Sequence, residues 1–457
     1  MQDLHTRRAF LQKSMAFLAV TPTVPTFLHN AMMSIANPAD IPLTQQPSGK
    51  DGKILVVVQL SGGNDGLNTV VPFADDAYHR ARASLAIAKD KVLKISDYLG
   101  LHPNLAPVKA LYDDGQLAIV QGVGYPNPNR SHFRSMDIWH SARPESEIVT
   151  SGWLGRYFDN TCSGCDPHVG VSFGETSPLA MQGERIRPLS FDKPDSYRYA
   201  GSDVERYKRL NSLDVTLATR PAVSTMQPAA PEAPARREAS PSHRARAGRG
   251  ATPMPAEQQV AGSTLEFLTR TAMDAQLSSD QILRITREHN PAGISYPGGN
   301  FGQGLRTIAA MIRGGLPTRV YYVSLGGFDT HAAQAGRHDQ LMQQFAQGVG
   351  AFWADLKQQK NDQRVLMMTF SEFGRRVAVN ASGGTDHGAA APVLLMGPAI
   401  KTGIVGRHPS LTDLDAGDLK FGIDFRSVYA TLIENWLDAP SKPILGQQFK
   451  TLGVLRT

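Results

Sequence analysis

The chain has very few cysteines: only Cys162 and Cys165, in TCSGCDPH, among 457 residues. Without a second pair at this spacing, a zinc site made of four cysteines of one chain is excluded. Such a pair could be a redox motif, half of a zinc site or a small-loop disulfide, and an oxidising compartment favours the disulfide. We therefore expect a structural disulfide or inert thiols here rather than redox catalysis.

The chain also lacks a hydrophobic run long enough to cross a membrane. Its N-terminal apolar stretch, residues 15–28, is short and rich in Pro and Thr, whereas a spanning helix needs about 20 apolar residues. Two adjacent arginines, Arg7 and Arg8, precede that stretch in TRRAFLQKS, which is the pattern of a twin-arginine export signal. We expect residues 1–48 to be signal and lead-in, and residues 49–457 to be a domain that the twin-arginine translocase carries to the periplasm or out of the cell.

The positive charge of the chain does not form one long basic stripe. The net charge is +6 and the pI is about 9.2, but several arginines fall in residues 217–257, which are dominated by Ala, Pro, Arg and Ser. That composition offers too few large apolar side chains to bury a core, so we expect a flexible surface insert there. No nucleic-acid-binding module is recognisable, so a nucleic-acid partner is disfavoured.

The chain does contain a series of short, continuous apolar runs rich in Val, Leu and Ile. Such runs are typical of strands buried on both faces, and segments with helical spacing lie between several of them. The alternation predicts an α/β fold in which helices cover both sides of a mainly parallel sheet. The strand-like runs are residues 53–60, 117–124, 320–327, 365–370 and 392–397, and the helical segments are residues 103–115, 300–315 and 338–359.

Polar side chains follow these runs where the predicted strands end. In open α/β sheets, ligands bind just beyond the carboxyl ends of the strands. If residues 392–397 pair antiparallel with residues 365–370, the loop between them, which contains GGTDHGAAA, starts and ends at this same edge. Carboxylate and imidazole groups together suit Zn, Mn, Mg or Ca. We therefore expect a divalent metal site formed by Asp65, Asp329, His331, Glu372 and His387.

A hydroxyl group lies near one predicted helix start. Ser131, in PNRSHFRSMDIW, would lie near a helix N-terminus, where free N–H groups and the helix dipole favour anions. The same residue could also be the N-cap of that helix. Arg130 and Arg134 nearby could hold a phosphate or sulfate group. If no metal is bound, these two arginines and Arg375 could instead balance the clustered carboxylates.

Seven stretches between Val56 and Leu437 carry a family resemblance: VVVQLSGGNDGLNTVVP, GVGYPNPNRSHFRSMDIW, SGWLGR, GGFDTH, FSEFGRR, GGTDHGAAAPVLLMG and DFRSVYATLIENWL. Together they resemble a bacterial, twin-arginine-exported, sulfatase-like family, domain of unknown function 1501, in the alkaline phosphatase and sulfatase superfamily. The resemblance implies an alkaline-phosphatase-like three-layer α/β/α sandwich. It implies no particular activity, because the family has no generally established one.

The superfamily resemblance also implies roles for the candidate residues. Ser131 would match the nucleophile at a helix start. Glu372 would stand where the superfamily usually has an Asp-His pair, but Phe373 follows it here, so that imidazole is missing. This departure favours a single hard cation or a decayed site over a full two-zinc site. The other metal ligands would be Asp65, Asp329, His331 and His387.

Two functions are compatible with these features. The first is an exported metal-dependent hydrolase of phosphate or sulfate esters, on small molecules or polymers, with Ser131 as nucleophile. The second is a non-catalytic binding or scaffold protein on a degenerate sulfatase-like fold. Simpler interpretations of single residues favour the second: Asp65 in GGNDG could be a turn former, and Glu372 could pair with Arg375 or Arg376.

Overall fold

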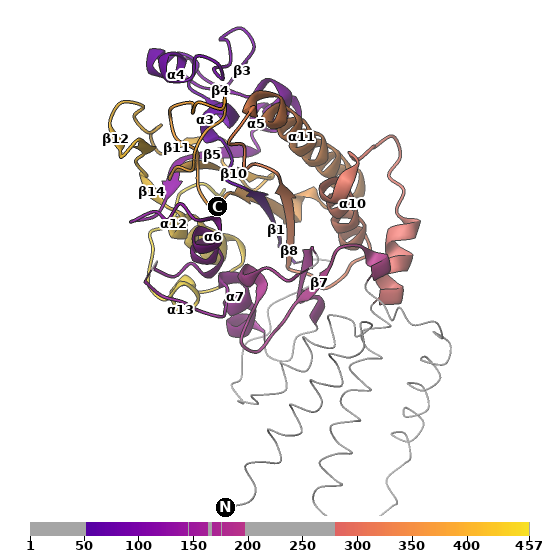
Figure 1. Cartoon of the computed structure of the whole chain (residues 1–457). Helices are drawn as coiled ribbons and strands as arrows, with labels where there is room; N and C mark the ends of the chain where they lie inside the picture. The colour runs from indigo at the N-terminus through magenta and orange to yellow at the C-terminus, as the bar shows by residue number, and fades with distance from the viewer. Residues whose placement is uncertain (1–51, 145, 163–166, 175, 197–278, 457) are drawn as a thin grey trace, which may run out of the picture. The chain divides into compact units, whose positions relative to one another are not determined.

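The computed structural model describes five segments of the chain, which belong to one compact unit (Figure 1). The expected export signal and lead-in, residues 1–48, and the expected insert at residues 217–257 lie outside the described residues. The described segments are residues 52–144, 146–162, 167–174, 176–196 and 279–456.

Within these segments the chain forms a mainly parallel sheet of nine strands, which confirms the predicted arrangement. β10 is antiparallel to both of its neighbours, β5 and β9, and the other strand pairs of this sheet are parallel. The order is β11 (Gly403–Val405), β5 (Leu117–Gly124), β10 (Ala391–Met396), β9 (Val365–Phe370), β1 (Ile54–Ser61), β8 (Val320–Gly326), β6 (Gly170–Phe173) and β7 (Leu189–Phe191), and β14 (Ile423–Asp424) also pairs with β5.

The central strands are buried on both faces, as their continuous apolar runs predict. Every residue of β5 and of β9 is buried, and β1 is buried from Ile54 to Leu60. Val56 of β1 lies between Tyr321 of β8 and Met367 of β9 in the parallel register. The sheet centre is therefore a rigid platform, and variation in chemistry is left to the loops at its edges.

Helices cover both faces of the sheet (Figure 1). One face carries α5 (Ala106–Asp113), α10 (Gly299–Arg313) and the long α11 (Gln334–Gln359). The other face carries α6 (His132–Ser141), α7 (Trp153–Thr161), α12 (Phe425–Thr431) and α13 (Ser441–Leu445). The three layers confirm the predicted sandwich, and α11 begins four residues before the predicted segment because the loop after β8 leads directly into it.

Stacked aromatic rings fix the second helix layer. Trp153 of α7 stacks on Tyr429 of α12 with ring centroids 4.2 Å apart, and Trp139 of α6 stacks on Phe425 at 4.4 Å. All four rings belong to the buried core that this layer shares with the sheet. Because α6 is held this firmly, the residue at its start has a defined position at the sheet edge.

The remaining elements are short. Cys162, directly after α7, is disulfide-bonded, as expected, and Cys165 lies outside the described residues. No helix in the described part of the chain is long and apolar enough to span a membrane. The short strands are β2 (Val70–Val71), β3 (Leu93–Lys94), β4 (Gly100–Leu101), β12 (Leu414–Asp415) and β13 (Asp418–Leu419), and the short helices are α3 (Gly66–Thr69), α4 (Asp76–Ala81), η1 (Pro103–Leu105), η2 (Pro167–Val169), η3 (Leu179–Met181), η4 (Pro194–Ser196), η5 (Asp362–Arg364), η6 (Leu432–Trp436) and residues 279–288.

The topology brings several loops to one edge of the sheet. β1, β5, β8 and β9 run in the same direction, so their carboxyl ends lie at that edge. β10 runs the opposite way and begins there, so the condition set for the loop, an antiparallel pairing of residues 392–397 with residues 365–370, is met. The loop of residues 371–390 therefore leaves and re-enters the sheet at the edge where ligands bind in open α/β sheets.

Candidate metal centre

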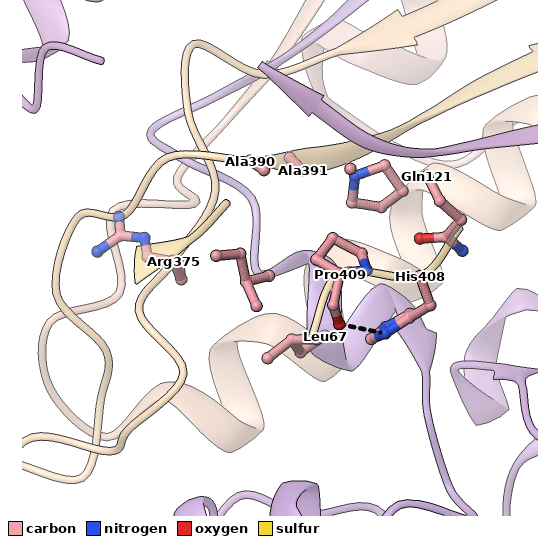
Figure 2. A pocket seen from close by; sticks show the side chains of 11 residues that line it. Leu67, Gln121, Arg375, Ala390, Ala391, His408 and Pro409 are labelled. Carbon is pink, nitrogen blue, oxygen red and sulfur yellow. Dashed lines mark hydrogen bonds between the residues drawn. The ribbon is translucent and has the colours of Figure 1, made fainter. Parts of the chain in front are cut away.

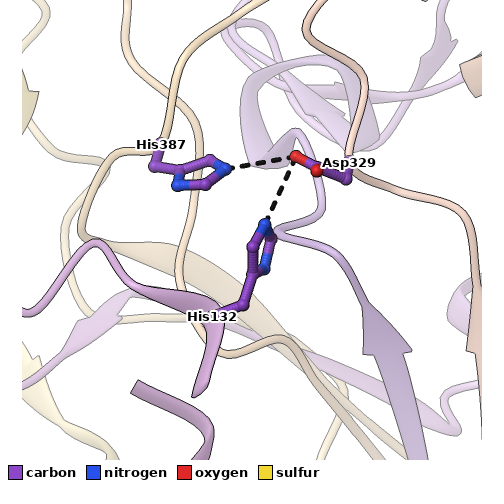
Figure 3. A group of neighbouring side chains, drawn as sticks. All are labelled: His132, Asp329 and His387. Carbon is purple, nitrogen blue, oxygen red and sulfur yellow. Dashed lines mark hydrogen bonds and ion pairs between the residues drawn. The ribbon is translucent and has the colours of Figure 1, made fainter. Parts of the chain in front are cut away.

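Three histidines converge on one carboxylate oxygen at this edge. Asp329 follows β8, His331 comes two residues later, His387 precedes β10, and His132 is the first residue of α6. The Nε2 atoms of His132, His331 and His387 lie 3.4, 3.1 and 3.1 Å from Oδ1 of Asp329. Figure 3 shows His132 and His387 pointing at Asp329 from two sides. We refer to these four residues as the His₃Asp group.

The Nδ1 atom of each ring has an acceptor as its partner. Nδ1 of His132 lies 2.8 Å from Oε1 of Glu372, and Nδ1 of His387 lies 2.7 Å from the carbonyl oxygen of Arg130. Nδ1 of His331 lies 3.3 Å from Oδ1 of Asp386. A carbonyl or carboxylate oxygen can only accept, so a proton on each Nδ1 satisfies these three contacts, and in a neutral ring of that tautomer Nε2 presents a lone pair.

The protonation states agree with this assignment for His387 and Asp329. Burial lowers the pKa of His387 more than its bonds to the Arg130 carbonyl and to Asp329 raise it, so the ring is neutral at neutral pH. Partial burial acts to raise the pKa of Asp329, but the hydrogen bond from Arg375 and the charge of its guanidinium outweigh it and hold the pKa of the carboxyl well below its usual range. An ionised carboxylate therefore faces the uncharged ring of His387.

This arrangement fits a divalent cation. The Nε2 atoms of His331 and His387 are 2.8 Å apart, and Nε2 of His132 is buried without a hydrogen-bond partner. Lone pairs directed at one another and at a carboxylate repel, unless a proton or a cation lies among them. In a tetrahedral zinc site with bonds of about 2.0–2.1 Å, ligand atoms are about 3.3–3.4 Å apart, close to the spacing around Asp329. His132, Asp329 and His387 could hold such an ion, with His331 beside them.

The donor set favours some metals over others. Three imidazole nitrogens and one carboxylate oxygen suit zinc and similar transition metals, whereas Ca²⁺ and Mg²⁺ prefer oxygen ligands. The Asp329 side chain is 48% exposed and the His132 side chain 31% exposed. A ligand could therefore reach the His₃Asp group from solvent.

Glu372 belongs to the surroundings of this group and does not point into it directly. Its side chain is buried, and Oε1 accepts hydrogen bonds from the backbone N–H of Gly62 and from Nδ1 of His132, both at 2.8 Å. We expected Glu372 to be a direct metal ligand, but in the structure its carboxylate orients the imidazole of His132 instead. Such carboxylate–histidine pairs are typical partners of metal ligands.

Asp65 lies apart from the His₃Asp group. One carboxylate oxygen accepts from the backbone N–H of Leu67 at 3.2 Å and caps α3, and the other accepts from Arg82 and Gln334. Burial acts to raise the pKa of Asp65, but the adjacent Arg82 guanidinium outweighs it, so the pKa lies below its usual value. With both oxygens used and the Asp65–Arg82 pair fully buried, the structure gives Asp65 a structural role in place of the expected metal ligation.

The three arginines expected to bind anions are all engaged within the protein. Arg375 is buried and donates to Asp329 at 2.8 Å and to the carbonyls of Gly63 and Thr385 at 2.7 Å. Arg134 donates to a backbone carbonyl at 2.6 Å, and Arg130 forms an ion pair with Asp418. Arg375 therefore fixes the loops around Asp329 and balances its charge, which is the role expected of it if no metal is bound.

Ser131 takes the N-cap position of α6 without capping it. Its side chain is exposed and makes no capping hydrogen bond, and its backbone N–H donates to Asn129 at 2.9 Å. The next residue, His132, is the one that enters the His₃Asp group. Sequence reasoning missed His132, although its place in the first turn of a helix after a strand-end loop was the signal that could have revealed it.

A small pocket adjoins the site at the end of β5 (Figure 2). It is lined mainly by Leu67, Gln121, Ala390 and Pro409, and Arg375 links it to the His₃Asp group. Nε2 of Gln121 is buried without a hydrogen-bond partner. This amide is a donor that a bound water or ligand could satisfy at the edge of the candidate centre.

The comparisons with known proteins identify a family. The family model described as protein of unknown function DUF1501 matches residues 52–436. The chain therefore belongs to this family. Among curated proteins, none matches the sequence.

Several solved structures are similar to this chain at low identity. One is a protein in the alkaline phosphatase superfamily from Vibrio parahaemolyticus, with 8% identity and a TM-score of 0.34 over 92% of this chain and 77% of that one. Another is the PsFucS1 sulfatase from Pseudoalteromonas sp., with 10% identity and a TM-score of 0.35 over 88% and 71%. A third is Ps i-CgsB in complex with k-i-k-neocarrahexaose, with 10% identity and a TM-score of 0.35 over 87% and 73%. Similarity at this level says nothing about activity, which has to be inferred from the geometry of the site.

Proposed function

We propose that the protein is an exported, metal-dependent hydrolase of phosphate or sulfate esters. The observation that carries this proposal is the convergence of three imidazole Nε2 atoms on the ionised Asp329, with each Nδ1 held by an acceptor. A bound divalent ion would polarise the ester oxygens and stabilise the negative charge that develops on them. His132, Asp329 and His387 would hold that ion, with His331 at its side.

The start of α6 supplies a place for the ester group. The first backbone N–H groups of this helix, together with its dipole, favour an anion next to His132. Ser131 stands at the same helix start, and its hydroxyl is free of any capping bond. In the proposed reaction Oγ of Ser131 attacks the phosphorus or sulfur atom, the alcohol leaves, and water then releases the acid from the seryl ester.

One observation supports the alternative of a non-catalytic binding or scaffold protein. The carboxylate of Asp65, which the superfamily resemblance assigns to a metal, forms a buried ion pair with Arg82 and accepts a hydrogen bond from Gln334. A protein that had lost one metal position in this way could keep the His₃Asp group only as a structural or ligand-binding cation site.

Metal analysis and kinetics separate the two functions. The full chain, purified from the compartment to which it is exported, is analysed for bound metal and then assayed on a panel of phosphate and sulfate esters. We expect a bound transition metal, loss of both metal and activity in His387→Ala, and loss of activity with retained metal in Ser131→Ala. Bound metal without turnover of any ester would favour the non-catalytic binding protein. Full activity of Ser131→Ala would show that water, and not Oγ of Ser131, attacks the ester.

A further inference from the structure

Two arginines beside the His₃Asp group share a single buried carboxylate. Nε of Arg130 donates to Oδ2 of Asp418 at 2.8 Å, and Nε of Arg376 lies 3.4 Å from Oδ1 of the same residue. The Asp418 side chain is 2% exposed, whereas those of Arg130 and Arg376 are 41% and 36% exposed. One buried carboxylate is thus shared by two guanidinium groups, and the half-exposed Asp386 is a further carboxylate within electrostatic range of Arg376.

Both arginines are tied to the loop that carries His387. The carbonyl oxygen of Arg130 accepts from Nδ1 of His387 at 2.7 Å. The backbone N–H of Arg376 donates to the carbonyl oxygen of Asp386 at 3.0 Å, and Arg375 forms an isolated antiparallel bridge with His387. The two guanidinium groups are therefore attached to the rim of the candidate metal centre.

The guanidinium of Arg376 has donors left over. Its Nε is buried without a hydrogen-bond partner, and its terminal nitrogens donate no hydrogen bond within the described residues. The guanidinium groups of Arg375 and Arg134, in contrast, donate hydrogen bonds to backbone carbonyl oxygens. A partly exposed, planar guanidinium with open donors is suited to bidentate recognition of an oxyanion.

We propose that Arg376, with Arg130, forms an anion subsite beside the His₃Asp group and that the substrate is a polyanionic ester. One anionic group would lie at the His₃Asp group and a neighbouring one on the arginine pair. This inference rests on the proposed function, because it names the class of ester that the same site accepts. Asp418 holds the two guanidinium groups in place, so that the subsite is formed before ligand binds.

Matched sulfonates test the subsite without turnover. Binding of meta-benzenedisulfonate and of benzenesulfonate to the full chain is measured by calorimetry, alongside metal content and melting temperature. The wild-type protein should bind the disulfonate about five- to tenfold more tightly than the monosulfonate, the size expected for one added charge-assisted contact. Arg376→Gln should remove this preference, and Arg376→Lys should retain part of it. Arg313→Gln, at the exposed end of α10 before β8 and so at the opposite sheet edge, is the control and should change nothing.

The outcomes of this experiment separate the two proposals. If the protein binds metal and hydrolyses esters but prefers neither sulfonate, the subsite is wrong and the hydrolase stands. The subsite is equally wrong if Arg376→Gln melts like the wild type and keeps the preference. If metal and turnover are absent but the disulfonate still binds more tightly in an Arg376-dependent way, the hydrolase is wrong and the anion subsite stands. If Arg376→Gln fails to fold, Arg130→Gln takes its place: loss of the disulfonate preference in that variant supports the subsite, and retention of the preference overturns it.

Discussion

Oε1 of the buried Glu372 accepts a hydrogen bond from Nδ1 of His132 at 2.8 Å, and this contact decides which nitrogen of the ring faces Asp329. The carboxylate also keeps electron density on the opposite nitrogen, which makes the ring a better metal ligand. Glu372 therefore affects metal binding indirectly, by orienting the ring of His132.

We predict that Glu372→Gln weakens metal binding about 10- to 100-fold while the fold is retained, because partners of this kind typically contribute that much. Gln keeps an acceptor oxygen for Gly62 and His132 but removes the charge. Competition with a chromophoric chelator measures the affinity, and circular dichroism verifies the fold. An affinity equal to that of the wild type would show that Glu372 only packs.

Replacing Asp65 should affect stability and leave the metal in place. In Asp65→Asn the Arg82 guanidinium stays buried without its counter-charge, which typically costs about 3–5 kcal/mol of unfolding free energy. Urea denaturation measures the loss, and metal analysis should give the wild-type content. The double variant Asp65→Asn, Arg82→Met should recover part of the stability, since it buries no unpaired charge. A fall in metal content in Asp65→Asn alone would show that Asp65 is a ligand after all.

Stability should fall as the pH drops below about 6.5, the value of a free histidine. Burial lowers the pKa of His140 to about 3 and that of His338 to about 4. Below pH 6.5 these two histidines bind protons in the unfolded chain but stay neutral in the folded chain. Their contribution to the unfolding free energy is therefore fully present above pH 6.5 and is lost as the pH falls toward their folded-state pKa values. Each such ring contributes up to about 1.4 kcal/mol per pH unit in this window.

His140→Gln tests this pH dependence. The ring of His140 lies 2.9 Å from the Tyr322 hydroxyl and 3.2 Å from Oε1 of Gln59, and Gln can replace one of these contacts. We expect lower stability at neutral pH but a shallower slope between about pH 6 and pH 4, by close to one proton. Urea midpoints at a series of pH values give that slope. An unchanged slope would mean that His140 is protonated in the folded protein.

Export should depend on the arginine pair near the N-terminus. We predict that Arg7→Lys combined with Arg8→Lys leaves the protein in the cytoplasm, because the translocase for folded proteins reads this pair. Fractionation with an antibody against the chain measures the distribution. A normal amount of the double variant outside the cytoplasm would exclude this export route.

The sequence was sufficient to predict the sheet and the edge that carries the site. Continuous apolar runs identify strands buried on both faces, and parallel strands place the residues that follow them together. Asp329 and His331 could be selected on that ground alone. Selecting His387 needed the further assumption that residues 392–397 pair antiparallel with residues 365–370, which the structure bears out.

The positions of Asp65 and His132 could not be predicted in the same way. The partner of Asp65 is Arg82, which lies just past α4, and only tertiary packing brings it under the sheet edge. His132 was overlooked because its neighbour Ser131 offers a hydroxyl for covalent chemistry. Which of two adjacent residues at a helix start faces inward depends on the residue at which the helix begins, and a sequence pattern defines that residue only to within one or two positions.

The reversed direction of β10 gives residues 371–390 an unusual mechanical position. Both ends of this loop are clamped in adjacent strands of the same sheet, so its length can change without shifting any other strand. Much of the loop is nevertheless part of the core: Val377 is buried, its carbonyl accepts from Arg82, and Thr385 donates to Gln334. The sheet would therefore act as a fixed frame in which only the exposed positions of the loop, such as Ala381 and Ser382, can change in length and charge without disturbing the site.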